Sequence, residues 1–273
     1  QELDIPMCLH LGAVPVLEAW KGYTPQTGAA MGATRAIASQ IQVIAMIVTE
    51  PPFDDPLVRK ALKLVVDPEE FIAIVAQGHG TPACNNPSWP NDQYYLALEC
   101  PQDIEGAKAL LAEAGYPDGL TIEFETSNVH PMWVGMATVY KEQAALAGIT
   151  VNIHQVPADG FWSGTWMVHP FAASYWNTKP IDNMMSVAFR CGASWNETFW
   201  CNEEKDALQD QARAEQDFDA RRALYQQAQR IIAEDGGTIA PFFNNSIRGV
   251  NVRLQGVPQN ATWFEFPINP TRP

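Results

Sequence analysis

The sequence predicts an α/β fold in which helices and strands alternate and neighbouring strands run parallel. A helix, a strand, a second helix and a second strand follow one another between residues 102 and 153, with short loops between them. Gly115 and Gly148 end the two helices, and both strands alternate apolar with polar residues. Elements in this order pack as helices on a sheet whose consecutive strands are neighbours.

Two further helices and a strand are expected before this unit. The apolar run 41–48 predicts a buried strand. Asp55 and Asp67 each precede a proline, which predicts two helix starts, because aspartate is a good N-cap and proline suits the first helical position.

The remaining elements are predicted from spacing and stop signals in the second half of the chain. They are a short helix over 158–167, a strand over 171–176, helices over 202–214 and 217–234, and short strands over 238–243 and 247–252. The helical period predicts that the helix over 217–234 buries Ala220, Leu224, Ala228 and Ile231.

The charge balance restricts the partners. The chain has 31 acidic and 17 basic residues among 273, a formal net charge of −14. A surface this negative repels nucleic acid and anionic lipid, so we expect neither as a partner. It is compatible with cationic or zwitterionic ligands.

Five cysteines stand without any C-x-x-C pair or the histidine spacing of a zinc site, so we expect no structural metal. Cys191 and Cys201 flank one loop, and Cys84 and Cys100 bracket another, so we predict two disulfides and an oxidising compartment. Five unrelated buried thiols are the alternative. Cys8 is left over.

Aromatic residues crowd positions 161–200, which hold ten of them, interleaved with polar side chains. Flat apolar surfaces with a few directed hydrogen-bonding groups suit a small-ligand pocket, although each tryptophan taken alone is more simply a core residue. The candidate ligand-binding residues in this segment are Trp162, Tyr175, Trp176, Asn177, Asp182, Trp195, Asn196 and Trp200.

Catalytic and cofactor-binding motifs are absent from the sequence. It has no G-x-S-x-G, P-loop, H-E-x-x-H or G-x-G-x-x-G after a strand. We therefore expect a binding protein without a cofactor rather than an enzyme. The aromatic segment with Asp159 and Asp182 leaves a secreted carbohydrate-active enzyme as the rival.

Several motifs resemble one family in order. Residues 51–62 contain PPFDD and VRKAL, residues 106–119 read GAKALLAEAGYPDG, and residues 145–149 read ALAGI. The helices over 202–214 and 221–235 add NEEKDALQDQARA and RRALYQQAQRIIAED. This series resembles the extracytoplasmic solute-binding proteins of ABC transporters for dipeptides, oligopeptides and nickel.

The resemblance implies a periplasmic-binding-protein-like α/β lobe, the C-terminal lobe of a bilobal clamshell, with remnants of the first lobe. Residues 1–50 and 241–273 would belong to lobe I, and residues 51–240 to lobe II. It implies that an N-terminal half of the same protein is missing, and that the protein is exported to the periplasm and delivers a small-molecule or peptide ligand to membrane permease subunits. A chemosensory binding protein on the same fold remains an alternative.

In peptide-binding relatives an acidic residue follows the tryptophan that Trp176 resembles. Here Asn177 and Lys179 stand near that position, and Asp182 is the nearest acid. The resemblance therefore implies a peptide or a modified, peptide-like solute, with Lys179 available to a ligand carboxylate. Asp182 has the alternative role of capping a helix.

Overall fold

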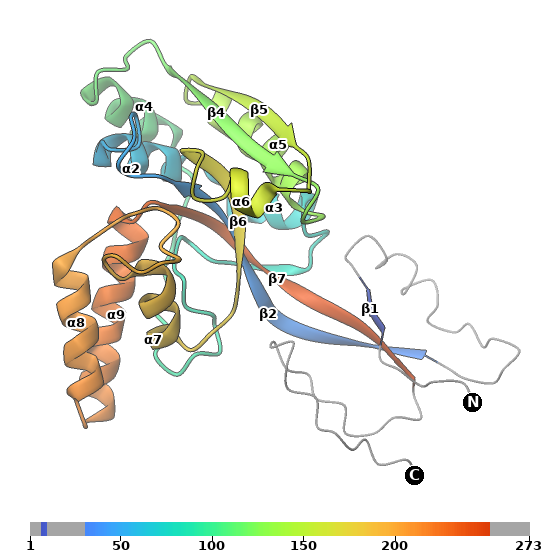
Figure 1. The fold of residues 1–273 in the computed structure, drawn as a ribbon, viewed down its shortest axis with the longest axis vertical. Coiled ribbons are helices and arrows are strands. Elements are labelled where there is room, and N and C mark those ends of the chain that lie inside the picture. Colours follow the sequence, from blue (N-terminus) through green and yellow to red (C-terminus); the bar gives the residue numbers. More distant parts are fainter. Residues whose placement is uncertain (1–6, 10–30, 252–273) are drawn as a thin grey trace, which may run out of the picture.

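The computed structural model describes residues 7–9 and 31–251, with side chains for residues 39–245. Within this part of the chain seven strands form one sheet (Figure 1), in the order β1-β7-β2-β6-β4-β5, with β3 paired to β7. The strands are β1 (Met7–Leu9), β2 (Met31–Met46), β3 (Gly80–Pro82), β4 (Leu120–Ser127), β5 (Ile149–Val156), β6 (Phe171–Asn177) and β7 (Thr238–Asn251).

The sheet is mixed, whereas the sequence predicted parallel neighbours. Strand β4 pairs in parallel with β5 and β6, and these three strands are connected through helices, as parallel pairing requires. Strand β2 instead runs antiparallel to both β6 and β7. The prediction of parallel neighbours is confirmed for β4–β6 and is wrong for β2 and β7.

The two helices whose starts were predicted from Asp55 and Asp67 begin there. The helices of the described residues follow in chain order. They are α2 (Pro56–Leu64), α3 (Pro68–Ile74), α4 (Ile104–Glu113), α5 (Trp133–Ala145), α6 (Phe161–Gly164), α7 (Ile181–Met184), α8 (Glu203–Ala214) and α9 (Phe218–Asp235), with a π-helical turn at Met185–Phe189 after α7. Asp55 accepts a hydrogen bond from the backbone N–H of Leu57, and Asp67 accepts from those of Glu69 and Glu70. Each aspartate thus satisfies free N–H groups of the first turn.

Helices cover both faces of the sheet. Ile44 and Met46 of β2 face a core that includes residues from α2, α3, α4 and α5. Ile41 and Val43 face a second core with residues of α7, α8 and α9. Figure 1 shows the two helical groups on either side of the strands. Side chains alternate between faces along a strand, so a strand that supplies both cores must be apolar on both sides.

Three element boundaries differ from the prediction. The strands expected over 238–243 and 247–252 are one strand, β7, which pairs with β2 along most of its length. The polar residue Asn244, between the two predicted strands, is satisfied within the sheet, because Gln42 donates to its side chain and Ser39 to its carbonyl oxygen. Strand β2 is longer than the predicted 41–48 and ends at Met46, and the helix expected over 158–167 is a single turn, α6.

Both predicted disulfides are confirmed. Cys84 and Cys100 are bonded with their Cα atoms 5.3 Å apart, and Cys191 and Cys201 with theirs 4.5 Å apart. Cys8 lies on β1 opposite Arg248 of β7. Of the helices in the described ranges, none has the length and apolar character to span a bilayer.

Candidate ligand-binding site

The candidate site lies where strands β4 and β6 end. These strands run parallel, so their carboxyl ends, Ser127 and Asn177, lie at the same edge of the sheet. Ligands of open α/β sheets settle outside this edge, where loops vary without disturbing the core.

Polar side chains from three elements meet at the edge. The Gln40 amide on β2 donates to Oδ1 of Asn177 over 3.0 Å, and its oxygen lies 3.3 Å from Nε2 of His130, which precedes α5. Asn177 is exposed. Since β2 pairs Gln40 with Asn177 in register, the sheet itself sets this amide pair at the surface.

An aromatic group borders these polar residues. The Tyr175 ring lies 5.2 Å from His130 and 6.0 Å from Trp162, centroid to centroid. Trp162 leaves 45% of its surface exposed, and Tyr175 is half-buried. Rings presented in this way supply rigid apolar area to a ligand.

Trp176, predicted as a ligand-binding residue, is a core residue in this structure. Only 7% of its surface is exposed, and its indole N–H donates to Oε1 of Glu197 over 2.7 Å. Its neighbour in the adjoining loop, Trp195, is 53% exposed, and the two ring centroids lie 6.1 Å apart.

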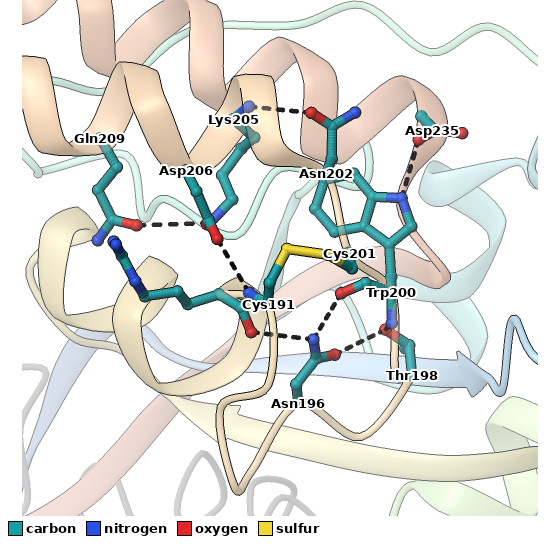
Figure 2. Close-up of a disulfide and its surroundings, with 11 residues drawn as sticks. Cys191, Asn196, Thr198, Trp200, Cys201, Asn202, Lys205, Asp206, Gln209 and Asp235 are labelled. Carbon is teal, nitrogen blue, oxygen red and sulfur yellow. Dashed lines mark hydrogen bonds and ion pairs between the residues drawn. A yellow bond between two sulfur atoms is a disulfide. The ribbon is translucent and has the colours of Figure 1, made fainter.

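The loop closed by Cys191 and Cys201 is held from within by Asn196 (Figure 2). The Asn196 amide donates to the backbone oxygens of Arg190 and Trp200, and its own oxygen accepts from the Thr198 hydroxyl. Asn196 is buried, so the structure gives this predicted site residue a loop-shaping role.

Trp200 has a structural partner as well. It is buried, and its indole N–H donates to Asp235 at the end of α9 over 2.8 Å.

Asp182 on α7 lies in a network of ion pairs and hydrogen bonds with residues of α8 and α9. It does not cap α7, which has no side-chain cap. Its carboxylate accepts from Arg213, Gln209 and Tyr225. Burial acts to raise the pKa of Asp182, but these hydrogen bonds outweigh it and lower that pKa. Lys179 is half-buried, two residues after Asn177.

The predicted residues differ in exposure. Trp162, Asn177 and Trp195 are exposed and Tyr175, Lys179 and Asp182 are half-buried, whereas Trp176, Asn196 and Trp200 are buried and hydrogen-bonded. Sequence reasoning did not select Gln40, His130 or Glu197, because only the pairing of distant strands and loops brings them here. The described residues contain no cluster of His, Cys, Asp or Glu able to hold a metal ion.

A cavity of about 380 Å³ lies elsewhere, between α2, α9 and the loop closed by Cys84 and Cys100. Lys60, Lys63 and Arg230 line it together with Glu99, Asp103 and Glu234. Its cations and anions balance, and it lies away from the edge formed by β4 and β6.

A family model described as "Bacterial extracellular solute-binding proteins, family 5 Middle" matches residues 11–197. Among curated proteins, heme-binding protein A of Haemophilus influenzae is 31% identical over 243 residues, covering 82% of this chain and 43% of that protein. The glutathione-binding protein GsiB of Pectobacterium atrosepticum is 29% identical over 211 residues, covering 70% of this chain and 40% of the relative.

The fold is shared with solved structures. The periplasmic binding protein DppA of Helicobacter pylori, in complex with the peptide STSA, superposes with a TM-score of 0.79 at 21% identity. The match covers 95% of this chain and 51% of that chain. This chain thus spans about half the length of the relatives that it matches, or less.

Proposed function

Because the chain belongs to the bacterial extracellular solute-binding proteins of family 5, we propose that it is the substrate-binding component of an ABC importer. It captures a peptide or a peptide-like small solute outside the cytoplasm and delivers it to permease subunits in the membrane. The observation that supports this proposal is the edge of the sheet where β4 and β6 end, because aromatic rings and the Gln40–Asn177 amide pair are exposed there.

The chemistry of this edge supports a peptide-like ligand. Amide side chains can donate to and accept from the peptide groups of a ligand, and exposed indoles can cover its apolar parts. The names and bound ligands of the relatives give the ligand classes to test: haem, glutathione and the peptide STSA.

The mechanism is binding without a chemical step. Such a protein works because its closed form binds the ligand more tightly than its open form, so that the ligand shifts the population toward the closed form. The residues at the edge fit this role, since they are amides, a histidine and aromatic rings.

The division into lobes is part of the proposal. Residues 51–240 form lobe II together with the inner ends of β2 and β7, which pack into its two cores, and the remaining parts of residues 1–50 and 241–273 belong to lobe I. The long β2–β7 ladder supports this division, because its outer part, where 31–36 pair with 246–251, continues beyond the helical layers in Figure 1. The amide pair at Gln40 and Asn177 then faces the space between the lobes. Export to the periplasm is also part of the proposal and is supported by the family and by the two disulfides.

Calorimetric titration of the whole protein with glutathione, the tetrapeptide STSA and haem tests this function. We expect one of the three to bind with a single site per chain. The variant Asn177→Ala should weaken that binding, while Glu203→Ala on the exposed start of α8 should not. Turnover of a glycoside, with no binding of any of the three probes, would favour the carbohydrate-active enzyme instead.

A further inference from the structure

Glu197 is a buried carboxylate that joins two tryptophans. Only 3% of its surface is exposed. One carboxylate oxygen accepts from the indole N–H of Trp166 over 2.5 Å, and the other accepts from that of Trp176 over 2.7 Å. Ser174 adds a third hydrogen bond. We call Glu197, Trp166 and Trp176 the indole clamp.

The Glu197 carboxyl group is surrounded by hydrogen-bond donors and has no cation beside it among the described residues. No ion pair joins Glu197 to any of the described residues. Burial raises the pKa of Glu197, and the hydrogen bonds from Ser174, Trp166 and Trp176 oppose that rise. No charged side chain contributes to the shift: neither His169 before β6, nor Asp182 on α7, nor Asp235 on α9. A carboxylate buried in this way is costly unless its oxygens are hydrogen-bonded, so its environment must match it closely.

The three members of the clamp come from three separate segments. Trp166 follows α6, Trp176 lies near the end of β6, and Glu197 belongs to the loop closed by Cys191 and Cys201. The hydrogen bonds of Glu197 therefore connect the α6 segment and the disulfide loop to the same strand.

Each clamped indole also supports one exposed indole. Trp162 packs edge-on against Trp166, with ring centroids 5.8 Å apart. Trp195 packs against Trp176 at 6.1 Å. The contacts thus form a chain from Trp162 through Trp166, Glu197 and Trp176 to Trp195, whose first and last rings are exposed and whose middle member is the buried Glu197.

We propose that Glu197 is a positioning residue of the ligand site, whose carboxylate sets the separation and orientation of the exposed indoles of Trp162 and Trp195 so that both contact one ligand. This inference rests on the proposed function. Glu197 does not touch the ligand; it acts through Trp166 and Trp176.

The substitution Glu197→Gln tests this role with little change in shape. A carboxylate accepts from both indoles, whereas the glutamine amide has one accepting oxygen and one donating nitrogen. One indole N–H then faces another donor and loses its hydrogen bond. The matched control is Asp235→Asn, which changes another carboxylate that accepts from an indole, that of Trp200, outside the clamp.

The first measurement needs no ligand. Fluorine NMR of the whole protein, labelled with fluorotryptophan, reports Trp162 and Trp195, which do not contact Glu197. We expect their resonances to shift or split in Glu197→Gln and to stay unchanged in Asp235→Asn. On lowering the pH of the unmodified protein, both should move with one midpoint above 4.5, the ordinary value for glutamate. Unchanged resonances in Glu197→Gln, in a protein that remains folded, would overturn the proposal.

The second measurement is the affinity, read by calorimetry, for whichever of glutathione, STSA and haem binds the unmodified protein. We expect the dissociation constant to rise at least about tenfold in Glu197→Gln and to stay unchanged in Asp235→Asn. Shifted resonances with an unchanged dissociation constant would contradict a role in the ligand site. If glutathione, STSA and haem all fail to bind the unmodified protein, the proposed function and the role that rests on it both fail, whereas unchanged resonances alone overturn only the clamp.

Discussion

Trp176 and Trp195 are neighbours in space with opposite exposure. The first is 7% exposed and donates its indole N–H to Glu197, whereas the second is 53% exposed and packs on the face of the first. The same residue type is therefore buried in the core at one position and exposed at the other, where we propose that it contacts the ligand. Their separation is decided by the loop that Asn196 and the Cys191–Cys201 bond hold in place.

The first prediction compares alanine substitutions at these positions. Trp176→Ala leaves a cavity and removes one of the hydrogen bonds of the buried Glu197 carboxyl group, so we expect the free energy of unfolding to fall by about 3–5 kcal/mol. Trp195→Ala should change it by no more than about 0.5 kcal/mol. Urea denaturation of both variants measures the difference. A Trp176→Ala protein as stable as the unmodified one would show that this tryptophan is not a core residue.

The second prediction concerns ligand binding by Trp195→Ala, the variant that should remain stable. Trp195→Ala should weaken binding of the probe by about 1–3 kcal/mol, as for an exposed aromatic anchor. Calorimetry on Trp195→Ala and on Phe218→Ala, an exposed aromatic residue of α9, supplies the comparison. Equal losses in the two variants would contradict a specific role for Trp195.

At the scale of elements, α2 is joined to the end of α9 by buried cations. The guanidinium of Arg59 pairs with Asp235 over 2.9 Å, and Nζ of Lys63 donates to the backbone oxygen of Ala233 over 2.9 Å and to that of Glu234 over 3.4 Å. Carbonyl groups of a last helical turn have no partner within the helix, and a positive charge there interacts favourably with the helix dipole. Burial, followed by repulsion from Arg59, nevertheless lowers the pKa of Lys63 from 10.5 to about 7.

This pKa predicts a pH-dependent contribution to stability. Between about pH 7 and pH 10.5 the unfolded chain keeps the Lys63 proton that the folded chain has lost. The unfolded state then binds more protons, so the free energy of unfolding rises with pH, by at most about 1.4 kcal/mol per unit from this one group. Lys63→Met should remove that slope between about pH 7 and 9. Urea denaturation at several pH values measures how the free energy of unfolding changes with pH in Lys63→Met and in the control Lys60→Met, which changes an exposed lysine. Equal slopes in the two variants would contradict the prediction.

The disulfide loop is a second element whose stability can be tested. Cys191 and Cys201 are ten positions apart and close the loop that carries Asn196, Glu197 and Trp200. Opening it gives the unfolded chain more conformational freedom, so the double variant Cys191→Ser/Cys201→Ser should lose about 2–3 kcal/mol. Thermal and urea unfolding measure the loss. Peptide mapping without reductant that recovers both thiols free from the unmodified protein would contradict the bond itself.

At the scale of the whole molecule, one sheet couples the ligand edge to both cores. Strand β6 supplies Phe171 and Ala173 to one core and Trp176 to the other, and ends at Asn177 on the edge. A ligand that binds the edge of the folded protein and not the unfolded chain must therefore raise its stability. The net charge of −14 adds solubility to this scaffold and disfavours polyanions as ligands.

The expected gain in stability on ligand binding follows from mass action. At a concentration one hundred times its dissociation constant, a bound probe stabilises the folded state by about 2.7 kcal/mol. We expect glutathione, STSA or haem, whichever binds by calorimetry, to raise the melting temperature of the whole protein as its concentration increases. The same probe should not raise it in Asn177→Ala to the same extent. A melting temperature that does not depend on the concentration of a bound probe would contradict a single folded binding state.

Interactions between residues close in the sequence could be predicted from the sequence. Asp55, Asp67 and Asp217 cap their helices through hydrogen bonds to backbone groups two or three residues away, so a short motif predicts each start. Both disulfides were predicted from cysteines that bracket short loops. The resemblance to the family rests on contiguous motifs, one of which, in residues 51–62, includes the cap Asp55.

Burial on α9 shows where local periodicity is insufficient. The predicted face contained Ala220, which is exposed, whereas Tyr225, Gln229 and Ile232 are buried. The amide of Gln229 donates to the Tyr94 carbonyl oxygen of a distant loop. A helical period gives the width of an apolar stripe, but the neighbouring elements decide which side is covered, and they can bury a polar residue if they satisfy it.

The sequence by itself determined the α/β class, the helix starts, the disulfide partners and the family. Each depends on residues a few positions apart, on a motif of contiguous residues or, for the disulfides, on cysteines 10 and 16 positions apart that bracket short loops. Only the tertiary structure decided that β2 and β7 make the sheet mixed, that Trp176 is buried and that Glu197 lies between two indoles. Glu197 is 31 positions from Trp166 and 21 from Trp176. Contacts over such separations form only once the strands and the loop have packed, so no local pattern of residues encodes them.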